Sequence, residues 1–152
     1  MTITHNMKKP EVIQPFTLAM AIALLSFMLA ALAVITPVHA AGKLAVQGQA
    51  IAQGQFEGRN NHLVTGTVQI VETQDGLVAL LSDDFVLDGA PDPQLAFGHN
   101  GRVDPRSVFT KLGKIRGQQA YRIPANIDPA NFTEFYVHCV RFNVPLGVAS
   151  LR

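Results

Sequence analysis

Cysteine and charge are scarce in this chain, and each shortage excludes a class of function. The 152 residues include one cysteine, Cys139, and 15% charged side chains, with a formal net charge of +1. A protein that binds nucleic acid usually has a basic face or stripe, so this composition argues against a nucleic-acid partner. A single cysteine also excludes an internal disulfide, which leaves a free thiol, an intermolecular bridge or a ligand.

Catalytic motifs are absent as well. The sequence contains no G-x-S-x-G elbow, no H-E-x-x-H pair, no glycine-rich phosphate loop, and neither C-x-x-C nor C-x-x-C-H. A hydrolase built from scattered side chains has no motif behind it. We therefore expect a binding or redox accessory domain rather than an enzyme.

One apolar run, Phe16–Ile35, dominates the amino-terminal part, and Lys8 and Lys9 precede it. Positive charge, an apolar segment and small residues after it are typical of a signal peptide, removed with residues 1–40. The run is almost long enough to cross a bilayer, so an uncleaved membrane anchor is the alternative. Either way we expect residues 41–152 to be exported to a periplasmic or other extracytoplasmic compartment, with membrane contact only through the apolar run.

The exported part follows a pattern of short strands. After a polar lead, residues 41–55, apolar and polar side chains alternate in LVTGTVQIV, residues 63–71. The turn signal QDG, residues 74–76, joins this run to residues 77–87 and predicts a hairpin. Across residues 56–152, seven or eight short strands separated by glycine and proline predict an all-β domain, an antiparallel β-sandwich or a small barrel. A hydrophobic helix would precede it, as signal or anchor.

Two further local predictions concern the carboxy-terminal third. In NIDPANF, Asp128 is expected to cap a single helical turn that has Pro129 at its first position. Residues 132–142 predict a long aromatic strand, and NVPLG, residues 143–147, predicts the turn into a closing strand.

Cys139 lies on that aromatic strand, on the face that carries apolar residues, while His138 lies on the other face. A buried free cysteine often packs as a small hydrophobe, and the alternative is a thiolate ligand to haem or a metal. Adjacent strand residues cannot bind one ion without a bulge, so a second ligand would be His62 or His99, or would be absent. No methionine follows residue 28 to serve as a ligand.

A cluster of carboxylates, Asp83, Asp84, Asp88 and Asp92, falls within DDFVLDGAPDP. Such oxygen ligands suit Ca²⁺, although their spacing does not match the D-x-[DN]-x-[DN]-G loop. The interpretation that we favour is that these residues end a strand and begin turns.

Four blocks together resemble the DM13 domain: LVTGTVQIV, DDFVLDGAPDPQLAFG, KLGKIRGQQAYRIP and FYVHCVRFNVPLGVASL, from about Phe56 to Leu151. The resemblance implies an extracellular all-β domain with a role in electron transfer. It also implies that Cys139, in the last block, is the redox residue or a haem ligand. This chain departs from the pattern in having His138 where an aromatic residue is common. It also has no fused redox domain, so electron transfer would need a separate membrane or soluble partner.

Two hypotheses follow. In the first, the chain is an exported electron-transfer domain centred on Cys139, with haem or another redox group. In the second, it is a non-catalytic structural or protein-interaction domain of the cell envelope with a buried structural cysteine.

Overall fold

The computed structural model describes residues 45–152, so the expected signal peptide or anchor and the hydrophobic helix lie outside the described residues. Within this part of the chain no helix is long and apolar enough to span a membrane. It contains eleven strands and two 3-10 turns: β1 (Gln49–Gly58), β2 (Val64–Thr65), β3 (Thr67–Thr73), β4 (Gly76–Leu81), β5 (Val86–Leu87), β6 (Pro93–His99), β7 (Arg102–Val103), η1 (Pro105–Ser107), β8 (Thr110–Lys111), β9 (Gln119–Arg122), η2 (Pro129–Asn131), β10 (Glu134–Cys139) and β11 (Val144–Ser150).

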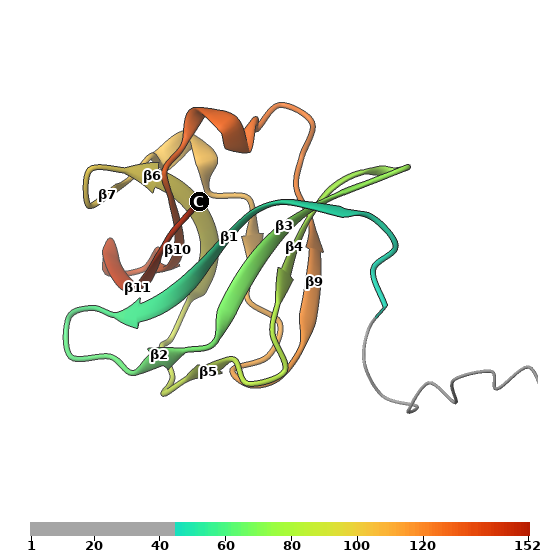
Figure 1. Cartoon of the computed structure of the whole chain (residues 1–152). Coiled ribbons are helices and arrows are strands. Elements are labelled where there is room, and N and C mark those ends of the chain that lie inside the picture. Colours follow the sequence, from blue (N-terminus) through green and yellow to red (C-terminus); the bar gives the residue numbers. More distant parts are fainter. Residues whose placement is uncertain (1–44) are drawn as a thin grey trace, which may run out of the picture. The chain divides into compact units, whose positions relative to one another are not determined.

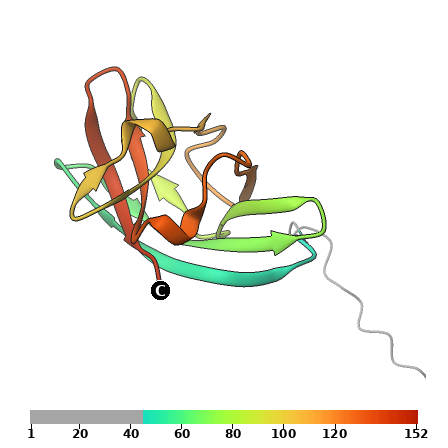
Figure 2. The ribbon, with the colours of Figure 1, turned by 90° about the horizontal axis from the view of Figure 1, so that it is seen from above.

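Most of the strands form one antiparallel sheet. Eight strands follow one another in the order β7-β6-β10-β11-β1-β3-β4-β9, and β8 pairs with β6, while β2 and β5 form a separate two-stranded ribbon. The sheet curls into a half-barrel (Figures 1 and 2). The all-β prediction is confirmed, and one continuous curled sheet takes the place of the two alternatives, sandwich or barrel.

The first strand begins inside the stretch expected as a polar lead. β1 starts at Gln49 and pairs with β3 on one side and β11 on the other. Its inward positions are occupied by small residues such as Ala52 and Gly54, which give little hydrophobic signal in the sequence. A Cβ at Gly54 would lie 2.5 Å from the carbonyl oxygen of Ser150, so the backbones approach closely there. This close approach is what the small residues permit.

The predicted hairpin is confirmed as β3 and β4. The alternation in residues 63–71 is also confirmed, because Val64, Val68 and Ile70 are buried. Gly76 has a φ of 117°, a conformation that favours glycine, and the Thr73 hydroxyl accepts a hydrogen bond of 3.2 Å from the Asp75 backbone N–H. The QDG signal therefore marks the turn correctly.

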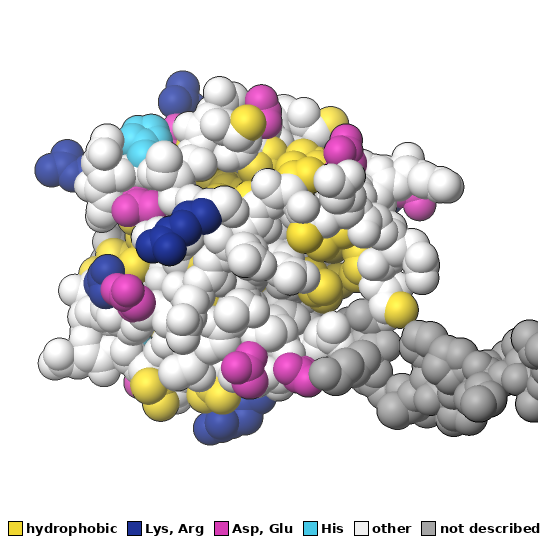
Figure 3. Space-filling view, viewed as in Figure 1, with side chains coloured by type: hydrophobic (Ala, Val, Ile, Leu, Met, Phe, Trp, Pro, Cys, Tyr) yellow, Lys and Arg dark blue, Asp and Glu magenta, His cyan; other side chains and the backbone are white. Residues whose placement is uncertain are grey.

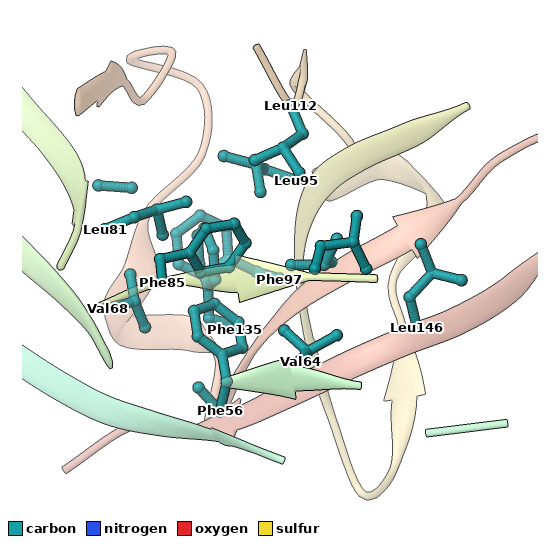
Figure 4. Close-up of a cluster of buried hydrophobic side chains, with 14 of the residues drawn as sticks. Phe56, Val64, Val68, Leu81, Phe85, Leu95, Phe97, Leu112, Phe135 and Leu146 are labelled. Atoms are coloured by element: carbon teal, nitrogen blue, oxygen red, sulfur yellow. The ribbon is translucent and has the colours of Figure 1, made fainter. Parts of the chain in front are cut away.

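Aromatic side chains fill the concave side of the half-barrel. Phe135 meets Phe97 at 5.0 Å between ring centroids and Phe56 at 6.2 Å, both edge to face, and Phe85 meets Phe56 at 5.5 Å (Figure 4). These four rings are at most 4% exposed. Burying each contributes about 1.5–3 kcal/mol. They come from β1, β6, β10 and the segment before β5, so the core ties distant parts of the chain together.

The end of the chain differs from one prediction. The turn between β10 and β11 is Val140–Asn143, and NVPLG lies mostly in β11, which begins at Val144. Asn143 has a φ of 51°, which lets a short turn close. Pro145 is tolerated in β11 because β1 ends at Gly58, opposite Gly147, so at Pro145 the strand is paired only with β10. The predicted cap is confirmed, since the Asp128 carboxylate accepts from the Ala130 N–H at 3.0 Å, with Pro129 following.

Candidate functional site

Cys139 is the last residue of β10. It lies directly opposite Pro93 of β6 and Val144 of β11, and its residue exposure is 1%. The side chain belongs to the main apolar core, together with Phe135 and Val137 of the same strand. The predicted face is therefore correct, and the thiol is enclosed by hydrocarbon.

The segment Asp88–Pro93 runs beside this end of β10. The carbonyl of Asp92 accepts a hydrogen bond of 3.2 Å from the backbone N–H of Val140, and Ala90 packs against the main core. We did not predict this contact, because the pairing of β6 with β10 joins residues 36 to 46 positions apart and neither segment alone encodes it. The segment, here called the acidic loop, therefore borders the cysteine.

The acidic loop is held from the other side by His62. The His62 Nδ1 lies 2.9 Å from Asp88 Oδ1, and Asp88 Oδ2 accepts from the Leu63 backbone N–H at 3.0 Å. The Leu63 N–H and then the His62 ring hold the pKa of Asp88 below its usual range. His62 is thus a partner of Asp88 rather than of the thiol.

His138 lies on the convex side of the sheet and is 5% exposed. The ladder between β10 and β11 shifts register between Val137 and His138, but the extra residue, Leu146, lies on β11, and β10 stays in register with β6. The alternation along β10 is therefore kept, so the imidazole and the Cys139 thiol leave from opposite faces. As predicted, these neighbours cannot bind one ion.

The imidazole of His138 has one ring nitrogen that forms no hydrogen bond within the described residues. Its Nδ1 is buried and has no hydrogen-bond partner among the described residues. Burial lowers the pKa of His138, and a hydrogen bond with the Asn143 side chain opposes this shift. The neutral ring is therefore the form that the fold accommodates.

The four carboxylates of DDFVLDGAPDP do not gather at one site. Asp83 is exposed, Asp84 accepts from the Ser82 hydroxyl, and Asp92 accepts from the Gln94 amide at 3.2 Å and lies 3.8 Å from Lys111 Nζ. Between residues 45 and 152, no group of three or more His, Cys, Asp or Glu side chains is placed to hold a metal ion. The hydrogen bonds that Asp84, Asp88 and Asp92 accept from nearby groups are of the kind that residues in turns make.

Haem does not fit the thiol as the fold places it. The Cys139 side chain is surrounded by packed apolar residues, and it lines none of four prominent cavities of the described region. A porphyrin needs a cleft beside its axial ligand, and here that space is filled by core side chains. His99 is at the opposite end of β6 from Pro93, stacked on Phe132 at 6.3 Å, and supplies no second ligand.

Charged side chains show no concentration of one sign on the face drawn in Figure 3, where Lys and Arg are scattered among Asp and Glu.

The family comparison is specific: a model described as electron transfer DM13 matches residues 55–151, nearly two thirds of the chain. No curated protein and no solved structure matches. The match covers every strand from the middle of β1 to the end of β11, including Cys139. The chain belongs to the DM13 electron-transfer family.

Proposed function

We propose that this chain is an exported electron-transfer domain whose redox group is the Cys139 thiol. The observation that supports this most directly is the position of the only cysteine: it ends β10, immediately beside the acidic loop, within the part of the chain that the family model matches. A thiol at the edge of a core becomes reachable when a bordering loop moves, whereas one at its centre does not.

The proposal places the redox step in an opened form of the domain. With the loop closed, the thiol is buried, and buried thiols react slowly because the reactive thiolate is disfavoured in apolar surroundings. Displacing the acidic loop would break the Val140–Asp92 hydrogen bond and the Asp88 contacts, and would leave the core strands in place. A separate membrane or soluble redox protein is the expected partner, and its docking is the event that would favour the open form.

The test measures electrons directly. The full chain is expressed with its own amino-terminal segment and with haem supplied, and is then titrated with ferricyanide, a one-electron acceptor. In the proposed oxidation two Cys139 thiols of separate chains form one disulfide and release two protons and two electrons, which reduce two ferricyanide ions to ferrocyanide. The wild type should therefore give up about one electron per thiol, and the Cys139→Ala variant none. If the two proteins consume the same amount of acceptor, the thiol is not the redox group.

The visible spectrum of the same two samples separates the thiol from haem. We expect no Soret band in either protein, because Cys139 is 1% exposed and core side chains fill the space that a porphyrin would need. A Soret band present in the wild type and lost in Cys139→Ala would instead make the cysteine a haem ligand. That result would require the core around β10 to rearrange.

A second function is favoured by one observation, the 1% exposure of Cys139 within apolar neighbours. In this alternative the domain is a non-catalytic structural or interaction module of the envelope, and the cysteine is a packing residue. This alternative predicts that neither the wild type nor Cys139→Ala releases electrons, and that Cys139→Ala has a lower free energy of unfolding than the wild type.

A further inference from the structure

A polar groove lies at the end of the half-barrel away from Cys139. Two adjoining cavities, of about 570 and 620 Å³, share His99, Asp104 and Arg106. One wall is the β6–β7 hairpin with η1, and the other is the segment Asn126–Asn131 that contains η2; both are at the top of the half-barrel in Figure 1. Cavities of this size are in the range that holds small ligands.

The wall formed by η1 is fixed to the sheet. Ser107 is 1% exposed, and its hydroxyl donates to the Phe97 carbonyl at 2.6 Å while accepting from the Phe97 N–H at 2.8 Å. Asp104 caps η1 by accepting from the Arg106 N–H at 2.9 Å, and it also accepts two hydrogen bonds from the Arg106 guanidinium. These bonds hold the pKa of the Asp104 carboxyl below its usual range. The carboxylate is therefore charged and oriented without any ligand.

The opposite wall is fixed to the same strand. The N–H of Thr133, just after η2, donates to the Gly98 carbonyl at 3.2 Å, and Asp128 caps η2. Ile127 is buried in the main core and anchors the segment from below. Both walls are thus attached to neighbouring residues of β6, and a preformed groove loses little entropy when it binds.

The charges of the groove exclude several ligand classes. Arg102 and Arg106 are balanced by Asp104 and Asp128, so the lining favours neither a strong anion nor a strong cation. An apolar ligand would remove water from these groups without replacing its hydrogen bonds, at a cost of several kcal/mol. A neutral ligand with many hydroxyl groups avoids all of these conflicts, because each hydroxyl both donates and accepts.

Two side-chain amides and a pair of rings in the groove also suit a ligand that is rich in hydroxyl groups. Asn126 and Asn131 are exposed, and a carboxamide has two donors and an acceptor, although one donor of Asn131 is used by Asp128 Oδ2 at 3.4 Å. The His99 and Phe132 rings are stacked, with an angle of 19° between their planes, and both line the cavity of about 570 Å³. Phe132 is also stacked on Phe97 at 5.5 Å, so the exposed His99 ring is the one that offers a flat face to a ligand. Such a face beside amides and carboxylates suits the apolar C–H face and the hydroxyl edge of a sugar ring.

We propose that this groove binds a neutral oligosaccharide, with the His99 ring, supported by Phe132, under a sugar ring and Asp104, Asn126 and Asn131 on the sugar hydroxyls. The inference is independent of the redox proposal, because the groove and the thiol lie at opposite ends of the sheet strands. An exported domain with such a groove would be held near glycans of the envelope or of a neighbouring surface.

The test uses the purified full chain, labelled with ¹⁵N, and follows backbone amide shifts on adding maltopentaose, cellopentaose or chitopentaose to about 10 mM, enough to detect millimolar affinity. At least one of the three should shift the amides of His99, Asn126 and Asn131. Asn126→Ala and Asn131→Ala should each weaken that affinity about fivefold, the value of one hydrogen bond. Gln74→Ala, in the exposed β3–β4 turn, is the matched control and should bind as the wild type does.

Three results would overturn the proposal. One is that none of the three oligosaccharides shifts the groove amides. Another is that the asparagine variants, with native amide dispersion, bind as tightly as Gln74→Ala does. The third is that inorganic phosphate shifts the same amides more strongly than any of the sugars, which would make the groove an anion site. Two separate asparagine variants keep the test valid if one of them fails to fold.

Discussion

Cys139 lies directly opposite Pro93 where β10 meets β6, so the only cysteine of the chain is paired with the last residue of the acidic loop. The next residue, Val140, donates its N–H to Asp92 at 3.2 Å. Movement of the loop and access to the thiol are therefore expected to be linked. This link can be measured without knowing any partner.

The first prediction concerns thiol labelling. Asp88→Ala removes the acceptor of the Leu63 N–H and of the His62 ring, and so weakens the attachment of the acidic loop. We expect Cys139 to react with a small thiol reagent in native buffer about fivefold faster or more, since each lost hydrogen bond changes the opening equilibrium by about that factor. Asp75→Ala, in the β3–β4 turn, should react at the wild-type rate. Equal rates in all three proteins would show that loop attachment does not control access.

The second prediction separates packing from polarity at Cys139. Cys139→Ser places a hydroxyl in an apolar site, and we expect it to lower the free energy of unfolding by about 1–3 kcal/mol. Cys139→Ala loses only packing and should cost less than the serine variant. Urea denaturation of the three proteins measures both differences. A serine variant as stable as the wild type would mean that water reaches this position.

A third prediction tests the contact between β2 and β11. A Cβ at Gly147 would lie 2.7–2.9 Å from three side-chain carbons of Val64, which is 2% exposed. Gly147→Ala should therefore lower the free energy of unfolding by about 1–3 kcal/mol, the usual cost of overpacking. The double variant Gly147→Ala with Val64→Ala should lose less unfolding free energy than the sum of the losses of the two single variants, because the smaller side chain leaves room for the new methyl group. Strict additivity would indicate that the two residues are not in contact.

The predictions made from the sequence succeeded where the signal was local. Alternation identified Val64, Val68 and Ile70 as buried, and the Asp128–Pro129 pair predicted its cap, because each depends on residues a few positions apart. β1 was missed in part because Ala52 and Gly54 fill its inward positions, where close backbone approach replaces side-chain packing.

The candidate site was only partly predictable for a related reason. The face of Cys139 follows from strand alternation, and the structure agrees. Its neighbour Pro93 and the Asp92–Val140 bond depend on sheet order, which brings β6 beside β10 although five shorter elements, β7, η1, β8, β9 and η2, intervene in the chain. The polar groove shares this property, since His99 and Asn126 are far apart in the sequence.

The fourth prediction concerns export. If residues 16–35 direct the chain out of the cytoplasm, a protease should digest residues 45–152 in cells whose outer membrane is permeabilised and whose cytoplasmic membrane is intact. Replacing Lys8 and Lys9 with glutamate should reduce that digestion, because orientation depends on the positive flank. The mass of the protected and released products separates a cleaved signal from an anchor. Complete protection of the wild type would mean that the domain stays inside.

The last prediction is a pH dependence set by His138. Burial lowers the pKa of this histidine in the folded protein, so the unfolded chain takes up its proton first as the pH falls below about 6.5, the ordinary value. The stability that the neutral ring provides is therefore fully present above pH 6.5 and is lost as the pH falls through the folded pKa. We expect the midpoint of urea unfolding to decrease over this interval.

His138→Phe should remove that part of the pH dependence. The substitution replaces an imidazole whose Nδ1 has no partner in the described residues with a ring that needs none, so the variant should be at least as stable as the wild type at pH 5. His62→Phe is the control: His62 is partly exposed and contacts Asp88, so its removal should lower stability near neutral pH and leave the His138 effect in place. Unfolding midpoints measured between pH 7 and about 5 test both, the lower limit staying above the carboxylate pKa values. Parallel pH profiles for the wild type and His138→Phe would show that the buried imidazole does not limit stability in acid.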